Sequence, residues 1–375
     1  MAISINYGRI LNYMSLKART LNIPIFGTFE LTPLCNMNCK MCYIRMTKEE
    51  MDKVGTNLSA DEWIRIAQEA VAEGMTMLLF TGGEAILHKD FKKIYLAIRK
   101  MGLFISINTN GTILNDEWIS FFKKYPPSKF NITLYGGSNE TYARLCRNPR
   151  GFDQVKKAIE KLQENNIEIL LNCTLTKENA SDIAPIFKFA NEHNLEVHAT
   201  TYNFPPVRKE GVDNLSMSRF TPKEAAKAKV LMNWYKLGKN NFIKLVNEVN
   251  NDKFLDDSYE VACGDGEGDK VLCAAGRANF WITWDGRILP CGMIPNSSVQ
   301  VKNRSFKEVW DKVVKDTSGI SLAPECKNCN KKKYCSPCAA KLFAETGSFD
   351  KKSEYMCEYV DEYLNLLKIS ENYLK

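Results

Sequence analysis

The sequence predicts an α/β protein, in which an open, partial (β/α)6 barrel is followed by a small, cysteine-rich α+β domain. Between residues 25 and 204, six apolar runs alternate with helical patterns, which is typical of repeated βαβ units around a parallel sheet. From residue 263 onward the elements become short, and eight cysteines follow before residue 358. We divide the chain into an N-terminal helical extension (1–24), the barrel (25–240), a linker (241–262) and the cysteine-rich domain (263–375).

The six barrel strands are predicted from short runs of apolar, β-branched and aromatic residues. They are IFGTFEL (25–31), MTMLLFTGG (75–83), LFISINTNG (103–111), KFNITLYGG (129–137), IEILLNCTL (167–175) and EVHATTYNF (196–204). Ser59 and Glu62 form a capping box before a helix over 61–72, and further helices are predicted over 89–101 and 152–164.

Three more elements are predicted after the last barrel strand. The capping box TPKE (221–224) begins a helix, and the polar stretch that follows it resembles a linker. The run FWITWDGRILPC (280–291) is a hairpin with a tight turn at Asp285 and Gly286. Another helix begins at Ser305.

Charge and composition exclude several classes of partner. The 51 basic and 44 acidic residues give a net charge of only +7 without a basic stripe, so we expect no nucleic-acid binding. No apolar run reaches the length of about 18 residues that a membrane helix needs, and the first residues lack the apolar core of a signal peptide. We therefore expect a cytoplasmic protein whose thirteen cysteines serve metal sites rather than disulfides.

The octet CNMNCKMC (35–42) carries the strongest chemical signal in the sequence. Cys35, Cys39 and Cys42 follow the first predicted strand, and the next cysteine is Cys146. Three thiolates can hold three irons of a 4Fe–4S cluster and leave the fourth iron open to another ligand. Structural zinc is the alternative, but zinc sites usually add a second cysteine pair nearby, which this segment lacks.

Two further loops follow predicted strand ends. TGGE (81–84) comes after the second strand, and NTNGT (108–112) comes after the third. Ligands of such barrels bind at the carboxyl ends of the strands. We therefore expect the octet and these two loops to meet in one site.

Together these motifs resemble those of radical S-adenosylmethionine (SAM) enzymes, whose CxxxCxxC cysteines hold a cluster that binds SAM at its open iron. The resemblance implies SAM contacts from Gly82, Gly83, Glu84, Asn108, Thr109, Asn110, Arg147 and Met41. The GGE motif would bind the amino group, the polar triplet the ribose, and the arginine the carboxylate. The methionine stands where the family usually has an aromatic residue, and its thioether can still pack on adenine. An Asn-Gly turn and a surface arginine are the structural alternatives.

The second half of the chain resembles a SPASM domain, which carries two auxiliary 4Fe–4S clusters. The resemblance implies that one cluster is ligated by Cys263, Cys273, Cys291 and Cys338. It implies that the other is ligated by Cys326, Cys329, Cys335 and Cys357. The gap before Cys338 is one residue shorter than is usual in the family. A double zinc ribbon is the structural alternative.

Two cysteines, Cys146 and Cys173, fit neither signature. Free cysteines are often simply buried. A thiol that faces the barrel interior could instead give a hydrogen atom to a substrate radical, so both residues are candidate hydrogen donors.

The resemblance also implies a reaction and its partners. Reductive cleavage of SAM yields a 5′-deoxyadenosyl radical, and SPASM enzymes mostly use it on peptides or proteins. We therefore expect an oxidoreductase that matures a ribosomal peptide, for example by a crosslink, with flavodoxin or ferredoxin as reductant. Residues 1–24 are too few to bury a core of their own, so a separate leader-peptide-binding protein is a further candidate partner.

Two alternatives to peptide maturation stay open. One is an anaerobic sulfatase-maturating enzyme, which forms formylglycine. Such enzymes carry an aspartate base directly after the cysteine that matches Cys291. This chain has Gly292 there, which cannot accept a proton. A multi-cluster electron carrier needs no substrate, and the GGE motif argues against it.

We expect anaerobically reconstituted protein to hold about twelve irons, because three cysteine-ligated clusters hold about four each. Replacing Cys35, Cys39 and Cys42 together with alanine should remove about four irons and all SAM cleavage, since no other cysteine is close in sequence to replace them. Iron and sulfide assays and chromatography of 5′-deoxyadenosine measure both effects. SAM cleavage by the triple variant would contradict the radical SAM prediction.

Overall fold

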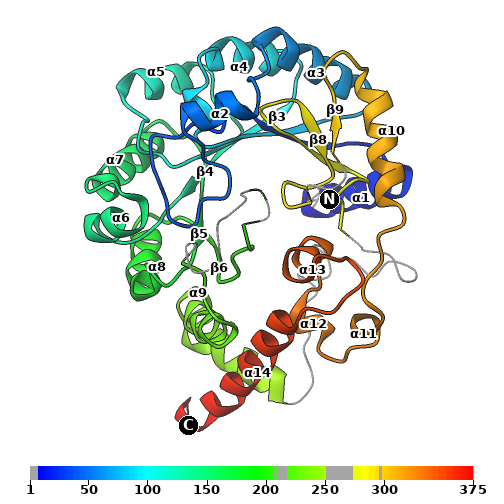
Figure 1. Ribbon diagram of the computed structural model, residues 1–375. Coiled ribbons are helices and arrows are strands. Elements are labelled where there is room, and N and C mark those ends of the chain that lie inside the picture. Colours follow the sequence, from blue (N-terminus) through cyan, green and yellow to red (C-terminus); the bar gives the residue numbers. More distant parts are fainter. Residues whose placement is uncertain (1–6, 207, 209–217, 251–272, 295–297, 375) are drawn as a thin grey trace, which may run out of the picture. The chain divides into compact units, whose positions relative to one another are not determined.

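Strands and helices alternate through residues 25–204 as the sequence predicts (Figure 1). The computed structural model describes residues 7–206, 208, 218–250, 273–294 and 298–374. Its first six strands are β1 (Phe26–Glu30), β2 (Met77–Thr81), β3 (Phe104–Thr109), β4 (Lys129–Thr133), β5 (Ile169–Thr174) and β6 (Val197–Thr200). The helices around them are α1 (Tyr7–Leu21), α2 (Lys48–Val54), α3 (Ala60–Ala72), α4 (Phe91–Arg99), α5 (Asp116–Lys124), α6 (Asn139–Cys146), α7 (Gly151–Glu164) and α8 (Ile183–Glu192). The predicted α/β class is confirmed.

The chain forms two compact units that cut across the predicted domains. Unit 1 contains Met1–Leu34, Met46–Ile107 and Ser258–Ser321. Unit 2 contains Cys35–Arg45, Asn108–Asp257 and Leu322–Lys375. We call Cys35–Arg45 the cysteine loop. Both halves of the predicted cysteine-rich domain thus join barrel segments, instead of packing only on each other.

In unit 1 the strand order is β3-β2-β1-β7-β8-β9, and β7 (Asn279–Ile282) pairs in parallel with β1. The predicted hairpin is confirmed: β8 (Arg287–Leu289) is antiparallel to β7, and β9 (Val299–Gln300) follows. The core beneath these strands is aromatic. The ring of Phe29 lies 4.8 Å from that of Trp63 in α3, and Phe280 lies 4.8 Å from Phe306 in α10 (Phe306–Thr317). The hairpin therefore extends the barrel sheet, which local sequence patterns could not show.

In unit 2, β4, β5 and β6 form parallel pairs. Alternate residues of β5 face opposite sides of the sheet, as in any strand. Leu171 and Cys173 are buried on one face, whereas Asn172 and Thr174 on the other face are partly exposed. The polar face is the one that is free to line a binding site.

The predicted linker is wrong over its first ten residues. Helix α9 (Pro222–Asn250) begins at the predicted capping box and continues to Asn250, with one non-helical residue at Gly238. Residues 251–262 lie outside the described residues. Helix α9 packs along α14 (Glu354–Leu374), as Figure 1 shows, and Phe242 and Val246 are buried against Leu367. This packing stabilises a stretch that its asparagine and lysine residues alone suggested to be a linker.

The remaining helices are short: α11 (Pro324–Lys327), α12 (Lys332–Cys335) and α13 (Ala339–Thr346). Cys326 lies in α11, Cys335 in α12 and Cys357 at the start of α14, whereas Cys329 and Cys338 lie in the segments between helices. No described helix combines the length and the apolar character that crossing a bilayer requires.

The contact between α9 and α14 includes one buried polar pair, and we expect its loss to destabilise the fold. The amide of Asn233 donates to the hydroxyl of Tyr363 over 2.8 Å, and both residues are buried. Tyr363→Phe should lower the free energy of unfolding by about 1–3 kcal/mol, because the buried amide loses its acceptor. Urea unfolding measures the change, and Tyr13→Phe on the surface of α1 is the control. Equal stability of the two variants would contradict this expectation.

Candidate functional site

The cysteine loop follows β1 and is built to hold thiolates. Cys35, Cys39 and Cys42 form no disulfide and are partly buried. The backbone N–H of Met37 donates to Sγ of Cys35 over 3.4 Å, and that of Arg45 donates to Sγ of Cys42 over 3.3 Å. Hydrogen bonds of this kind favour the thiolate, which is the form that binds metals.

The last turn of α6 packs against this loop. The backbone N–H of Asn38 donates to the carbonyl of Cys146 over 3.2 Å, and that of Lys40 donates to the carbonyl of Leu145 over 3.0 Å. Carbonyls at the end of a helix otherwise lack helical partners. Cys146 is fully buried, and its thiol makes a side-chain hydrogen bond that lowers the pKa of Cys39.

The three residues predicted to contact the ribose lie at the end of β3, and one of them touches the loop. The amide of Asn110 donates to Oδ1 of Asn36 over 2.9 Å and to Sγ of Cys35 over 3.6 Å. Thr109 is buried and accepts a hydrogen bond within the following turn. Asn108 accepts from a neighbouring amide on β4. The NTNGT loop and the octet therefore meet, as predicted.

The GGE motif passes so close to the chain before the cysteine loop that no side chain fits there. A Cβ on Gly82 would lie 2.4 Å from the carbonyl oxygen of Thr32, and a Cβ on Gly83 would lie 2.4 Å from that of Leu34. The N–H of Gly83 donates to Thr32, and the N–H of Glu84 donates to Leu34, each over 2.8 Å. Glycine is thus required at both positions by a close backbone approach.

Three other predicted residues lie at different depths. Met41 is buried within the cysteine loop, whereas Arg147 is exposed and ends α6 in the left-handed region, with φ of 57°. Cys173 lies on the buried face of β5 with Leu171, on the opposite side from Asn172. A thiol in this packed core does not suit the predicted donation of hydrogen to a substrate in the barrel interior.

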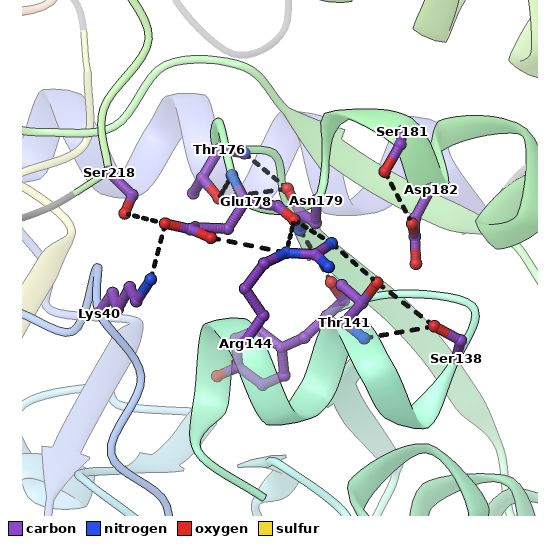
Figure 2. Close-up of polar contacts among 11 residues, drawn as sticks. Lys40, Ser138, Thr141, Arg144, Thr176, Glu178, Asn179, Ser181, Asp182 and Ser218 are labelled. Carbon is purple, nitrogen blue, oxygen red and sulfur yellow. Dashed lines mark hydrogen bonds and ion pairs between the residues drawn. The ribbon is translucent and has the colours of Figure 1, made fainter. Parts of the chain in front are cut away.

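A polar cluster contacts the cysteine loop and helps to hold it in place (Figure 2). The sequence analysis did not predict this cluster. Glu178, in the segment after β5, accepts from Nζ of Lys40 over 2.8 Å and from Oγ of Ser218 over 3.2 Å. Arg144 on α6 donates to the backbone carbonyl of Glu178 and pairs with its carboxylate at 3.5 Å. The Lys40 ammonium holds the pKa of Glu178 below its usual range. These residues are far apart in sequence, so no local motif marks them.

Four C-terminal cysteines line one small cavity, together with Lys341 and Met356: they are Cys326, Cys335, Cys338 and Cys357. Cys338 therefore lies with the ligands predicted for the second auxiliary cluster, although it was predicted for the first. Cys329 is exposed. Cys273 and Cys291 belong to unit 1, and Cys263 lies outside the described residues.

The donor set suits iron–sulfur clusters. None of the twelve cysteines in the described part of the chain forms a disulfide. Among the described residues, no three His, Cys, Asp or Glu side chains converge on a point where a single metal ion could be held. A cluster does not need such convergence, because each thiolate binds a different iron.

Residues 29–190 match the model of the Radical SAM superfamily. This span contains the cysteine loop, the GGE motif, the NTNGT loop and Cys146. This part of the chain is therefore similar to radical SAM domains.

The chain is similar to two curated proteins over different lengths. It is 23% identical to an AdoMet-dependent heme synthase from Methanosarcina barkeri, over 90% of this chain and 97% of that protein. It is 29% identical to the sporulation killing factor maturation protein SkfB from Bacillus subtilis, over 44% of this chain but only 39% of that protein.

A solved structure has the same fold. SuiB from Streptococcus suis, bound to its precursor peptide SuiA, superposes with a TM-score of 0.66 at 17% identity. The superposition covers 93% of this chain and 80% of SuiB. It shows that this chain shares the fold of SuiB beyond the segment that matches the family model.

We expect Glu178→Gln to weaken the fold slightly and in a pH-dependent way. The partners are partly exposed, so the loss at neutral pH should be below about 1 kcal/mol. Because the pKa of Glu178 is lowered in the folded state, its contribution is present above the ordinary glutamate pKa of about 4.3 and is lost as the pH falls through the folded value. Urea unfolding near neutral pH and in acid measures both points.

Glu192→Gln is the matched control, since Glu192 forms a longer, exposed pair with Lys188 at 3.8 Å. An effect of Glu178→Gln that equals the control, or that does not change with pH, would contradict the role given to the cluster.

Proposed function

We propose that this protein is a radical SAM enzyme that oxidatively modifies a peptide and carries auxiliary clusters in a SPASM-type C-terminal region. The cysteine loop is the observation that supports this most directly. Backbone N–H groups donate to Sγ of Cys35 and to Sγ of Cys42, and backbone bonds tie the loop to the end of α6.

In this proposal Cys35, Cys39 and Cys42 hold three irons of the cluster. When bound, the cluster supplies the electron that cleaves SAM to a 5′-deoxyadenosyl radical, which can take hydrogen from a substrate carbon. The two glycines bring Glu84 to the segment before the loop, where it would bind the SAM amino group. Asn110 orients Cys35 through its amide hydrogen bond.

The C-terminal cysteines would hold the auxiliary clusters. The cavity lined by Cys326, Cys335, Cys338 and Cys357 supports one cluster there. Cys273 and Cys291, with Cys263, are proposed ligands of the other. We also propose a cytoplasmic location, reduction by a flavodoxin or ferredoxin, and a separate leader-binding protein as partner.

Amide groups on the polar faces of β3, β4 and β5 support a peptide as substrate. Asn131 accepts no hydrogen bond at Oδ1 from the described residues, although this oxygen is buried and its Nδ2 donates to Asn108 over 2.9 Å. Asn172 lies on the next strand, opposite Thr133. A buried acceptor without a donor costs about 1–3 kcal/mol. A backbone N–H of a bound peptide would supply that donor.

Gly292 argues against formylglycine formation. A Cβ at this position would lie 3.0 Å from ring atoms of Trp281. An aspartate base at this position would therefore require the indole to shift by a few tenths of an ångström.

Synthesis of heme is a second candidate function. The near full-length similarity to an AdoMet-dependent heme synthase favours it, since only 39% of SkfB is matched. The two candidates differ in substrate but use the same cluster and SAM machinery.

We expect the reconstituted, reduced protein to convert SAM into 5′-deoxyadenosine and to remove hydrogen from a precursor peptide encoded beside its gene. Mass spectrometry of the co-expressed peptide measures the loss, with the variant lacking Cys35, Cys39 and Cys42 as control. An iron porphyrin precursor of heme is the parallel substrate. Product from the porphyrin alone would replace the peptide proposal by the second candidate. The absence of 5′-deoxyadenosine would refute both.

A further inference from the structure

Arg219 and Glu345 form a buried ion pair in unit 2. Nη1 and Nη2 of the guanidinium group donate to Oε2 and Oε1 of the carboxylate, the first over 3.2 Å, and the two side chains are only 5% and 9% exposed. The hydroxyl of Tyr202, just after β6, donates to the same Oε1 over 2.6 Å. Charges are buried in proteins when they are paired and hydrogen-bonded in this way. The pair therefore fixes one arrangement of the three segments that supply it.

Two aromatic rings contact the guanidinium group of Arg219. Its central carbon lies 3.9 Å from the ring centre of Tyr355 and 5.2 Å from that of Tyr202. The hydroxyl of Tyr355 also donates to the backbone carbonyl of Phe220 over 3.0 Å. Tyr355 belongs to α14 and lies two residues before Cys357, one of the four cysteines that line the small C-terminal cavity. Cation–π contacts are strongest when the cation is removed from water, so this contact ties the start of α14 to Arg219.

Helix α13 connects the same ion pair to the C-terminal cavity. Cys338, which lines the cavity, directly precedes the first residue of α13, and Glu345 lies in the last turn of this helix. Lys341 lies between them and also lines the cavity, and its Nζ is 5.1 Å from the ring centre of Tyr202. A helix moves as a rigid element, so the position of Glu345 sets that of Cys338.

Most of the helices that carry the cysteines of the cavity are too short to hold their positions alone. Helices α11 and α12 have four residues each, and α13 has eight. Isolated helices shorter than about 12 residues are marginal in water, and most helical stability in proteins comes from tertiary packing. Cluster ligands must nevertheless stand at fixed points, because each thiolate binds a different iron. The contacts of Arg219 supply this fixation for α13 and for the start of α14.

We propose that Arg219 is a positioning residue for an auxiliary cluster in the C-terminal cavity. Its ion pair with Glu345 holds Cys338 in place through α13. Its contact with the ring of Tyr355 holds Cys357 in place through α14. Arg219 acts through these two helices, because a guanidinium group offers no lone pair to a metal. The inference rests on the proposed function, since it presumes that a cluster binds in the cavity.

Iron release to a chelator tests this role in the anaerobically reconstituted full chain. The cluster of the cavity is the one whose electron paramagnetic resonance signal is absent when Cys335 and Cys357 are both replaced by alanine. Arg219→Met and Glu345→Gln should each release this cluster about tenfold faster than the wild type, as expected when a metal site loses an outer-shell contact. Each should also change the shape of the signal, because the ligands are held differently. The double variant should be no faster than the faster single variant, since both changes remove the same contact.

Tyr363→Phe is the matched control, because it removes a buried hydrogen bond of the same helix, α14, to Asn233 on α9. Its cluster should be released at the wild-type rate and show an unchanged signal. Wild-type release rates in Arg219→Met and Glu345→Gln, or an equal acceleration in Tyr363→Phe, would overturn the inference. So would a double variant in which the accelerations of the two single variants multiply.

Two further outcomes are decisive. If Arg219→Met does not fold, Arg219→Lys takes its place, because lysine keeps the charge but lacks the planar fork. It should still release the cluster faster than Tyr363→Phe does, and an equal rate would overturn the inference. A wild type that binds no cluster in the cavity refutes this part of the proposed function and the inference with it, whereas a bound cluster with equal release rates in all variants overturns the inference alone.

Discussion

The docking of the cysteine loop onto the last turn of α6 is the contact on which the site depends. The loop belongs to no helix or sheet, yet its buried backbone N–H and C=O groups need hydrogen-bond partners. The last carbonyls of α6 need donors from outside the helix, because they have none within it. The bonds from Asn38 and Lys40 satisfy both and fix the backbone on either side of Cys39. A loop held in this way can present three thiols without the help of regular structure.

The relative strength of the surrounding contacts follows from their burial. Each backbone bond contributes about 0.5–1.5 kcal/mol, and exposed ion pairs contribute about 0–1 kcal/mol. Lys40 and Glu178 are partly exposed, so their pair refines the position of the loop rather than creating it. The GGE motif acts by shape instead. Because carbonyls of Thr32 and Leu34 occupy the space of a Cβ, any side chain at Gly82 or Gly83 would push the segment before the cysteines away.

Sequence periodicity predicted the barrel strands, the hairpin and the capped helices, because each of these depends on residues close together in the chain. The capping boxes at Ser59 and Thr221 and the cysteine octet are such local signals. The misread stretch of α9 shows the limit. Its asparagine and lysine residues suggested a linker, but Phe242, Val246 and Val249 recur at helical spacing and pack against α14, which lies more than a hundred residues away. The pairing of β7 with β1 and the bond between Lys40 and Glu178 are equally non-local.

Trp281 shows how the fold of unit 1 bears on the choice of reaction. Its indole N–H donates to Oε2 of Glu30 over 2.8 Å, and Glu30 is fully buried at the end of β1. The other side of the indole fills the space beside Gly292. An aspartate at Gly292 would therefore have to displace the ring, at a cost of about 1–3 kcal/mol for overpacking, and would take one donor from a buried carboxylate. Packing beside Gly292 therefore disfavours, by about this amount, a proton acceptor placed directly after Cys291.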